Sequence, residues 1–204
     1  MREAVIVSTA RTPIGKAYRG SFNNLASPTL AGHAISAAVE RAGIEPDRIE
    51  DCIMGAALTQ GSQGGNIGRT AALRAGLPVT VSGMTIDRQC SSGMMAVATA
   101  AKQVIHDGMD VAVGGGVDSI SLVRNEHMNL YRAADEELLA MHKDIYMPML
   151  ETAEVVAARY NVGRDAMDEY GLQSQQRAAA GYEAGKFDDE LVPVTCERIV
   201  YDKE

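Results

Sequence analysis

The chain has 204 residues, of which 46% are hydrophobic, with a formal net charge of −8 and a pI near 5.0. This composition is typical of a globular protein and excludes a largely disordered chain. With 4% aromatic residues and no tryptophan, an acidic chain is poorly suited to bind nucleic acids, and no apolar stretch reaches the roughly 20 residues that span a bilayer. We therefore expect neither a nucleic-acid partner nor a membrane span.

The first 120 residues alternate between predicted strands and helices. The run 4–8 is almost entirely apolar, as in a strand that is buried on both faces. The same reading predicts further strands at 52–58, 82–86 and 109–114, and helices at 29–42, 66–75 and 91–105. Such an alternation predicts an α/β fold, in which right-handed crossovers join parallel strands.

Two segments of this region have unusual compositions. The glycine-rich connection 60–65 fits neither the P-loop nor the dinucleotide-binding spacing, so we favour a flexible turn over a phosphate-binding loop. The helix at 91–105 carries no charge before Lys102 and is apolar on every side. A helix of this kind belongs between layers of a structure.

The pattern changes after residue 121. Residues 122–148 are irregular, and two helices are predicted after them, at 151–160 and at 165–182. Asp165 is the predicted N-cap of the second helix, and Gly185 closes it. The tail predicts a strand at 191–194, followed by a charged loop that extends to Glu204.

Cys90 lies where the third predicted strand ends and the apolar helix begins. The unpaired N–H groups and the positive dipole end of a helix N-terminus favour the nucleophilic thiolate, and Arg88 adds positive potential nearby. The alternative is a buried structural cysteine. Three cysteines, at positions 52, 90 and 196, are widely spaced and form no metal-ligand pattern, so we expect no metal site, no disulfide and a cytoplasmic location.

Several segments of the chain together resemble the thiolase family, which comprises acetyl-CoA acetyltransferases and 3-ketoacyl-CoA thiolases. The matching segments follow the order of the family and extend over essentially the whole chain. They are STARTPIG (8–15), NIGRTAALRAGLP (66–78), RQCSSG (88–93), GGGVDSIS (114–121), and MPMLETA (147–153) running into YGLQSQQ (170–176).

This resemblance implies one βαβαβαββ half of a layered αβαβα fold over residues 1–121, and over 122–204 part of a mainly helical loop domain that contributes to coenzyme A binding and tetramer contacts. It implies that Cys90 attacks an acyl carbonyl and carries the acyl group as a thioester. The reaction would be thiolysis of a 3-ketoacyl-CoA or condensation of two acyl-CoA molecules. Coenzyme A thioesters would then be substrates, with no separate cofactor, and homo-dimers or homo-tetramers are expected.

Two positions depart from the pattern of the family. Met149 matches a methionine that lines the pantetheine channel, but it stands in Pro-Met-Leu where relatives often have His-Met-Gly, so a gap-filling methionine remains an alternative. Asp118 stands where relatives commonly have glutamate, which we interpret as a conservative subfamily difference.

Thiolases complete their site with an activating histidine, an Asn–water oxyanion hole and a second cysteine, all of them in C-terminal motifs that this sequence does not show. None of the four histidines (His33, His106, His127 and His142) lies in such a motif, and neither does Cys196. Our first hypothesis is therefore the N-terminal half of a thiolase, inactive without the remaining half. The alternative is a non-catalytic, thiolase-like scaffold subunit, which would have no need of a reactive thiol. A ketoacyl synthase is disfavoured because its nucleophile region differs.

Overall fold

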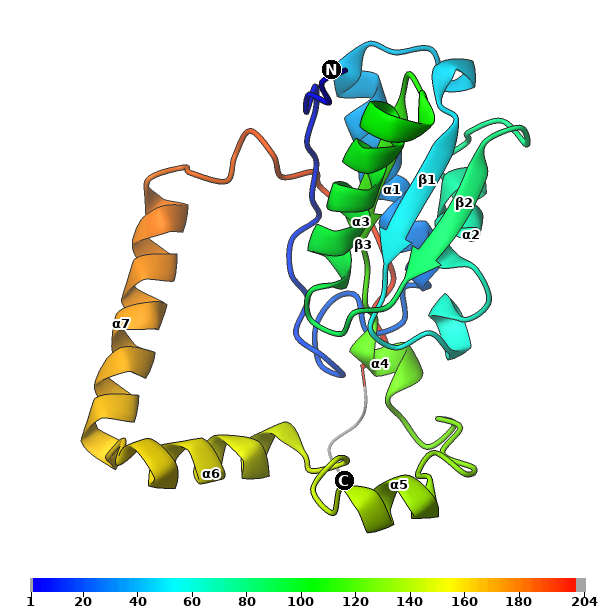
Figure 1. The fold of residues 1–204 in the computed structure, drawn as a ribbon. Helices are drawn as coiled ribbons and strands as arrows, with labels where there is room; N and C mark the ends of the chain where they lie inside the picture. Colours follow the sequence, from blue (N-terminus) through cyan, green and yellow to red (C-terminus); the bar gives the residue numbers. More distant parts are fainter. Residues whose placement is uncertain (1, 201–204) are drawn as a thin grey trace. The chain divides into compact units, whose positions relative to one another are not determined.

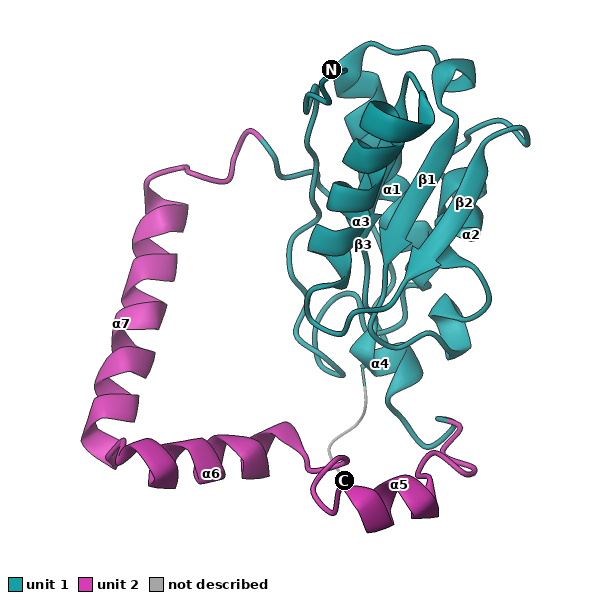
Figure 2. Ribbon diagram, in the orientation of Figure 1, with its two compact units in different colours: residues 1–128, 190–204 teal, residues 129–189 magenta. Residues whose placement is uncertain are grey.

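The structure of the protein, a computed structural model, describes residues 2–200. These residues form two compact units (Figures 1 and 2): residues up to 128 together with those from 190 onward, and residues 129–189. The sequence predicted a thiolase half over 1–121 and part of a loop domain over 122–204. Compactness alone does not test these domain assignments, so they stay a prediction. The last four residues of the predicted charged loop lie outside the described residues.

The first unit contains a parallel sheet of three strands in the order β2-β1-β3. The strands are β1 (Asp51–Gly55), β2 (Ser82–Ile86) and β3 (Ala112–Gly116). All five residues of the central strand β1 are buried, as expected for a strand covered on both faces. Gly55 at its end is in register with Ile86 and Gly116, so the carboxyl ends of all three strands meet at one edge.

Helices cover both faces of this sheet (Figure 1), because residues of β1 point alternately to opposite sides. Cys52 and Met54 pack in a core with α1 (Ser27–Ala42) and α2 (Ile67–Arg74). Ile53 packs on the other face against Ala96 and Ala100 of α3 (Ser92–Lys102). The α3 helix continues as a π-helix, η3 (Gln103–Asp107), and short elements complete the unit: η1 (Pro46–Arg48), η2 (Gly61–Gln63) and α4 (Ile120–Val123).

Three helices make up the second unit: α5 (Glu136–Met141), α6 (Met149–Tyr160) and α7 (Arg164–Glu183). The two predicted helices of this region are confirmed as α6 and α7. The predicted cap is wrong, because α7 begins one residue before Asp165 and its N-cap is Gly163. Asp165 instead lies in the first turn, where the negative charge of its carboxylate interacts favourably with the positive end of the helix dipole.

Two predicted strands are absent from the described residues. Residues 4–8 pair with no strand, and Val5, Ile6 and Val7 are 75%, 76% and 65% exposed. They lack a partner because a cavity, lined by these residues together with β3, α1 and α3, separates them from β3. Residues 191–194 contribute one bridge, between Leu191 and Arg11, and no ladder.

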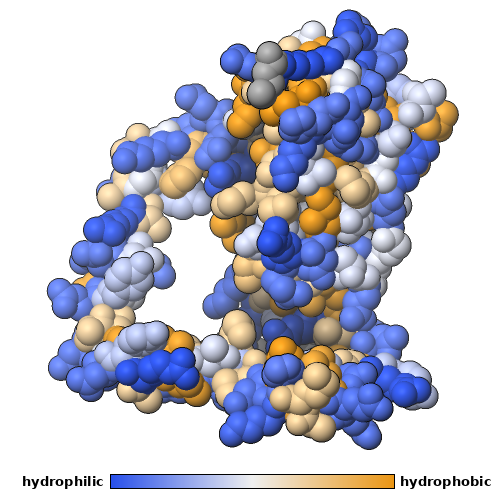
Figure 3. Space-filling view, viewed as in Figure 1, coloured by the Kyte–Doolittle hydropathy of each residue, from blue (hydrophilic) through white to orange (hydrophobic). Residues whose placement is uncertain are grey.

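The α3 helix is apolar on both sides, but the described residues cover only one of them. Ala96 and Ala100 are buried against the sheet, whereas Met94 is 78% and Val97 is 41% exposed. Figure 3 shows hydrophobic residues among polar ones on the surface viewed from the side of α3. The helix was predicted to lie between two layers. Within residues 2–200 one face of α3 packs on the sheet as predicted, and its other face is exposed.

Candidate active site

Cys90 is exposed and lies in the turn between β2 and α3. The hydroxyl of Ser92 holds this turn, because it accepts from the Arg88 N–H at 2.8 Å and donates to the Gln89 carbonyl at 2.6 Å. Gln89 has a φ of 49°, in the left-handed region that residues other than glycine adopt mainly where the surroundings enforce it. The predicted location of Cys90 at the N-terminus of the helix is confirmed.

Arg88 does not point into the site. Its Nη1 lies 3.3 Å from the sulfur of Met95, one turn along α3. The backbone of Arg88 takes part in the turn through Ser92, but its side chain does not line the cavity beside Cys90.

A cavity of about 360 Å³ opens beside Cys90 at the carboxyl edge of the sheet. In open α/β sheets this edge is the usual place for a ligand. Asp118 carries the one charge among the lining residues, which are Gly55, Gln89, Cys90, Ser92, Gly93, Gly116, Val117 and Asp118.

Glycines in β1 and β3 allow α3 to approach the strand backbones. A Cβ on Gly55 would lie 2.2 Å from the carbonyl carbon of Ser92, and one on Gly114 would lie 2.8 Å from the Cα of Val97. Atoms do not approach this closely, so any side chain at either position would displace the helix. The glycines therefore set the position of the first turns of α3, and with them the position of Cys90.

A hydrogen-bond network that the sequence did not reveal fixes Asp118. Its Oδ1 accepts from the Nε2 of Gln63 at 2.6 Å, and both carboxylate oxygens lie 3.2 Å from the Ala57 N–H. Gln63 is fully buried. Its position in a cluster of glycines predicted only a turn, and no local pattern could have paired it with a residue 55 positions away.

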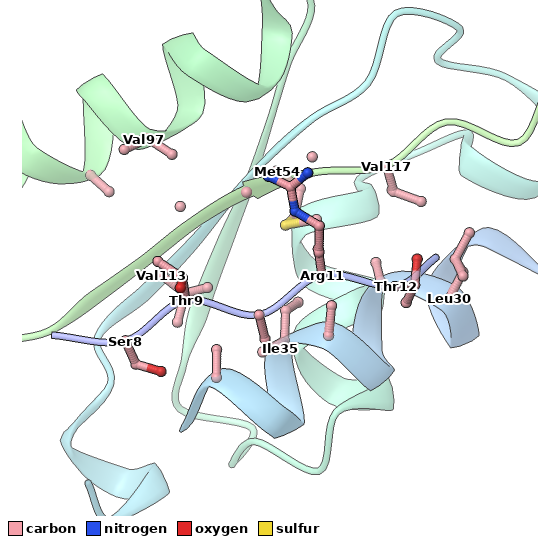
Figure 4. A pocket seen from close by; sticks show the side chains of 18 of the residues that line it. Ser8, Thr9, Arg11, Thr12, Leu30, Ile35, Met54, Val97, Val113 and Val117 are labelled. Atoms are coloured by element: carbon pink, nitrogen blue, oxygen red, sulfur yellow. The ribbon is translucent and has the colours of Figure 1, made fainter. Parts of the chain in front are cut away.

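A larger cavity of the first unit lies elsewhere. It measures about 990 Å³ and is not lined by Cys90. Figure 4 shows side chains around it from the N-terminal segment (Ser8, Thr9, Arg11 and Thr12), from α1 (Leu30 and Ile35) and from β3 (Val113). Its lining is mainly apolar, and Arg11, Lys16 and Asp118 are the charged residues among those that border it.

Met149, the second predicted site residue, is the first residue of α6 in the unit 129–189, and it is 74% exposed. It is not among the residues that line the Cys90 cavity. No histidine lines this cavity in the described chain either. His33 Nε2 lies 2.7 Å from the carbonyl oxygen of Pro193, and His127 pairs with Glu126.

The other two cysteines lie in different environments. Cys52 is fully buried in β1, and its burial, together with the neighbouring Asp51 carboxylate, raises the pKa of its thiol from 9.0 to about 12. The folded state thus holds this proton more tightly, which stabilises it below pH 9.0, and the contribution is lost as the pH rises towards 12. Cys196 lies with its sulfur 3.2 Å from the Ser21 carbonyl. All three are free cysteines.

The described residues contain no group of His, Cys, Asp and Glu side chains that could hold a metal ion. No helix among them is long and apolar enough to cross a membrane.

Comparison with known proteins identifies the family. Residues 4–203 match the family profile "Thiolase, N-terminal domain". The chain belongs to the thiolase family. It is 40% identical to the 3-ketoacyl-CoA thiolase of Bacillus subtilis (strain 168) over 95% of its own length, and 41% identical to the acetyl-CoA acetyltransferase of Cupriavidus necator, again over 95%.

The fold agrees with this thiolase assignment. The crystal structure of the Bacillus anthracis acetyl-CoA acetyltransferase matches 98% of the chain with a TM-score of 0.81 and 34% sequence identity, which confirms the predicted thiolase-like α/β fold. The chain covers 49% and 51% of the two relatives above and 52% of this structure, so it spans about half the length of the thiolases that it matches.

The packing of α3 on the sheet gives a first prediction. Gly55→Ala should lower the free energy of unfolding by about 3 kcal/mol, because the new methyl group overlaps the backbone of Ser92. Gly93→Ala is the matched control, since its Cβ would meet only the Gly116 Cα, at 3.9 Å. In urea denaturation this control should leave stability unchanged or raise it. Equal effects of the two substitutions would contradict the close approach.

The cysteine environments give a second prediction. In the folded chain at about pH 8, iodoacetamide should label Cys90 and leave Cys52 unmodified, because Cys52 is buried and its raised pKa keeps it as a thiol. Peptide mass spectrometry after labelling measures both sites. Both cysteines should react in urea. If Cys52 were labelled at the same rate as Cys90 without urea, its thiol could not be buried in β1.

Proposed function

We propose that this chain carries the nucleophile of an acyl-CoA acyltransferase of the thiolase type. The observation that supports this most directly is the position of Cys90, an exposed thiol in a chain of the thiolase family. It opens on a cavity at the carboxyl edge of a parallel sheet, at the N-terminus of α3. A buried structural cysteine would have neither the exposure nor the cavity.

The chemistry follows from the thiol. In condensation, the sulfur of Cys90 attacks the thioester carbonyl carbon of an acyl-CoA, the bond from that carbon to the coenzyme A sulfur breaks, coenzyme A leaves as the thiol, and the acyl group stays on Cys90 as a thioester. The α-carbon of a second acyl-CoA then loses a proton and takes the acyl group from Cys90.

In thiolysis, the sulfur attacks the C3 carbonyl of a 3-ketoacyl-CoA, the C2–C3 bond breaks, acetyl-CoA leaves after its α-carbon takes up a proton, and the acyl group on Cys90 passes to free coenzyme A. Coenzyme A thioesters are the substrates, and we propose no separate cofactor and no metal. Met149 is the proposed contact for the pantetheine part.

The proposed reaction needs a base that removes the thiol proton, and the described residues lining the cavity include no histidine. We propose that the remaining half of the protein supplies this base. The same observation favours the second candidate, a non-catalytic thiolase-like scaffold subunit. The acyltransferase and the scaffold differ at Cys90: the acyltransferase forms an acyl thioester there, whereas a scaffold does not need an exposed thiol in a cavity.

Association with further polypeptide also has physical support in the first unit. The apolar outer face of α3 and the apolar segment 4–8 are exposed, and β3 pairs with β1 on one side only among the described strands. Apolar surface of this kind marks an interaction site. We propose that the remaining half of the protein or a second copy of the chain covers it. The free, widely separated cysteines support a reducing compartment, for which we propose the cytoplasm.

Incubation with acetyl-CoA tests the acyl transfer. We expect an acetyl adduct on Cys90 that forms slowly in the chain alone, because no base completes the site, and faster when the C-terminal half of a relative is added. Mass spectrometry of the tryptic peptide measures it. Cys90→Ser should abolish the adduct, and Cys196→Ser should not. An adduct rate independent of Cys90 contradicts the function, and rapid turnover by the chain alone contradicts the need for a second half.

Light scattering tests the association. The exposed apolar face predicts that the purified chain forms oligomers or aggregates, and that Val97→Glu on this face shifts it towards monomer. Glu151→Lys, on the exposed side of α6, is a control in which charge changes without removing apolar surface. A stable monomer at all concentrations would exclude an exposed interaction surface.

A further inference from the structure

We propose that Asp118 makes the Cys90 cavity selective against acyl groups that carry a negative charge. This inference rests on the acyl-transfer function proposed above and specifies its substrate class: thioesters of neutral acyl groups are accepted, and those of dicarboxylic acids are disfavoured. Asp118 is a specificity-determining residue in this proposal.

The Asp118 carboxylate is held in place from behind. Gln63 donates to its Oδ1 at 2.6 Å, and the amide of Gln63 cannot rotate, because its Oε1 accepts from the Ser119 N–H at 2.9 Å and from the Ser27 hydroxyl at 3.1 Å. Gln63 and Ser27 are both fully buried, so this support is rigid and shielded from water. Asp118 lines the Cys90 cavity and also borders the larger cavity beside the N-terminal segment.

Asp118 has no salt-bridge partner in the described part of the chain. Its hydrogen-bond donors are an amide side chain and a backbone N–H, both neutral. The other residues that line the cavity are uncharged. Arg88 is the one basic residue in the turn before α3, and its guanidinium lies against the sulfur of Met95.

The location of the charge gives it a specific effect. Acyl transfer requires the carbonyl carbon to reach Cys90, and in this proposal the acyl chain occupies the adjoining cavity of about 360 Å³, whose wall includes Asp118. An acyl chain that ends in a carboxylate then brings two negative charges close together, and they repel each other. A neutral acyl chain incurs no such repulsion.

A pair of alkylating agents tests the charge selectivity on the whole chain. Iodoacetamide and iodoacetate are similar in size and differ in charge, and with both the thiolate sulfur displaces iodide. We expect the ratio of the iodoacetamide rate to the iodoacetate rate at Cys90 to exceed that of N-acetylcysteine by about fivefold at low salt. Asp118→Asn keeps the acceptor oxygen for Gln63 and should bring the ratio to within about twofold of N-acetylcysteine.

Two further variants make the same change in net charge elsewhere. Asp47→Asn lies in η1, before the amino end of β1 and thus at the opposite edge of the sheet. Asp87→Asn lies three residues before Cys90, but its carboxylate accepts from the Gln89 N–H at 2.9 Å and does not line the cavity. Neither should lower the ratio as Asp118→Asn does. Equal reductions in all three variants would show a general charge effect and overturn the proposal.

The unmodified chain provides a test that depends on no variant. Its rate ratio at Cys90 should decrease as the salt concentration rises, because salt screens the Asp118 charge. A ratio equal to that of N-acetylcysteine at low salt overturns the proposal. Alkylation does not require acyl transfer, so the two proposals can fail separately. Charge selectivity without an acetyl adduct contradicts only the proposed function, and an adduct on Cys90 without charge selectivity contradicts only the role of Asp118.

Discussion

The close approach of α3 to the backbones of β1 and β3 is the constraint on which the rest of the first unit depends. At Gly55 and Gly114 there is no room for even one methyl group between strand and helix. Backbone then packs on backbone, and the helix cannot shift or rotate without a collision. Because Cys90 lies two residues before the first residue of α3, the same contact fixes where its sulfur opens on the cavity.

This constraint also explains the composition of α3. The face towards the sheet needs small residues, and Ala96 and Ala100 provide them. It does not explain the opposite face, where Met94 and Val97 are large, apolar and exposed. A solvent-facing helix surface normally carries polar residues, so these side chains are suited to a second packing partner. The helix therefore has the sequence of a middle layer, and residues 2–200 supply only one of the two layers around it.

The sequence predicted those features that depend on local patterns. The apolar runs of β1 and β2, the helix with Gly43 after its end, and the position of Cys90 at the start of α3 all follow from a few neighbouring residues. Prediction failed where a distant partner decides the outcome. Residues 4–8 have the composition of a buried strand but no neighbour to pair with, and the contact between Gln63 and Asp118 joins loops that are 55 residues apart.

The site draws on the loop that follows each of the three strands. Gln63 follows β1, Cys90 follows β2 and Asp118 follows β3, and parallel pairing brings the three carboxyl ends to one edge. Cys90 and the charged wall of its cavity thus belong to one compact unit, whereas no histidine of the described chain lines that cavity. Under the proposed function, the choice among acyl groups is built into this chain, and the rate of their transfer depends on groups that another part of the protein brings. If the proposals hold, selectivity and proton transfer reside in different parts of the protein, so a substitution at Asp118 alters the choice of acyl group without touching the groups that transfer the proton.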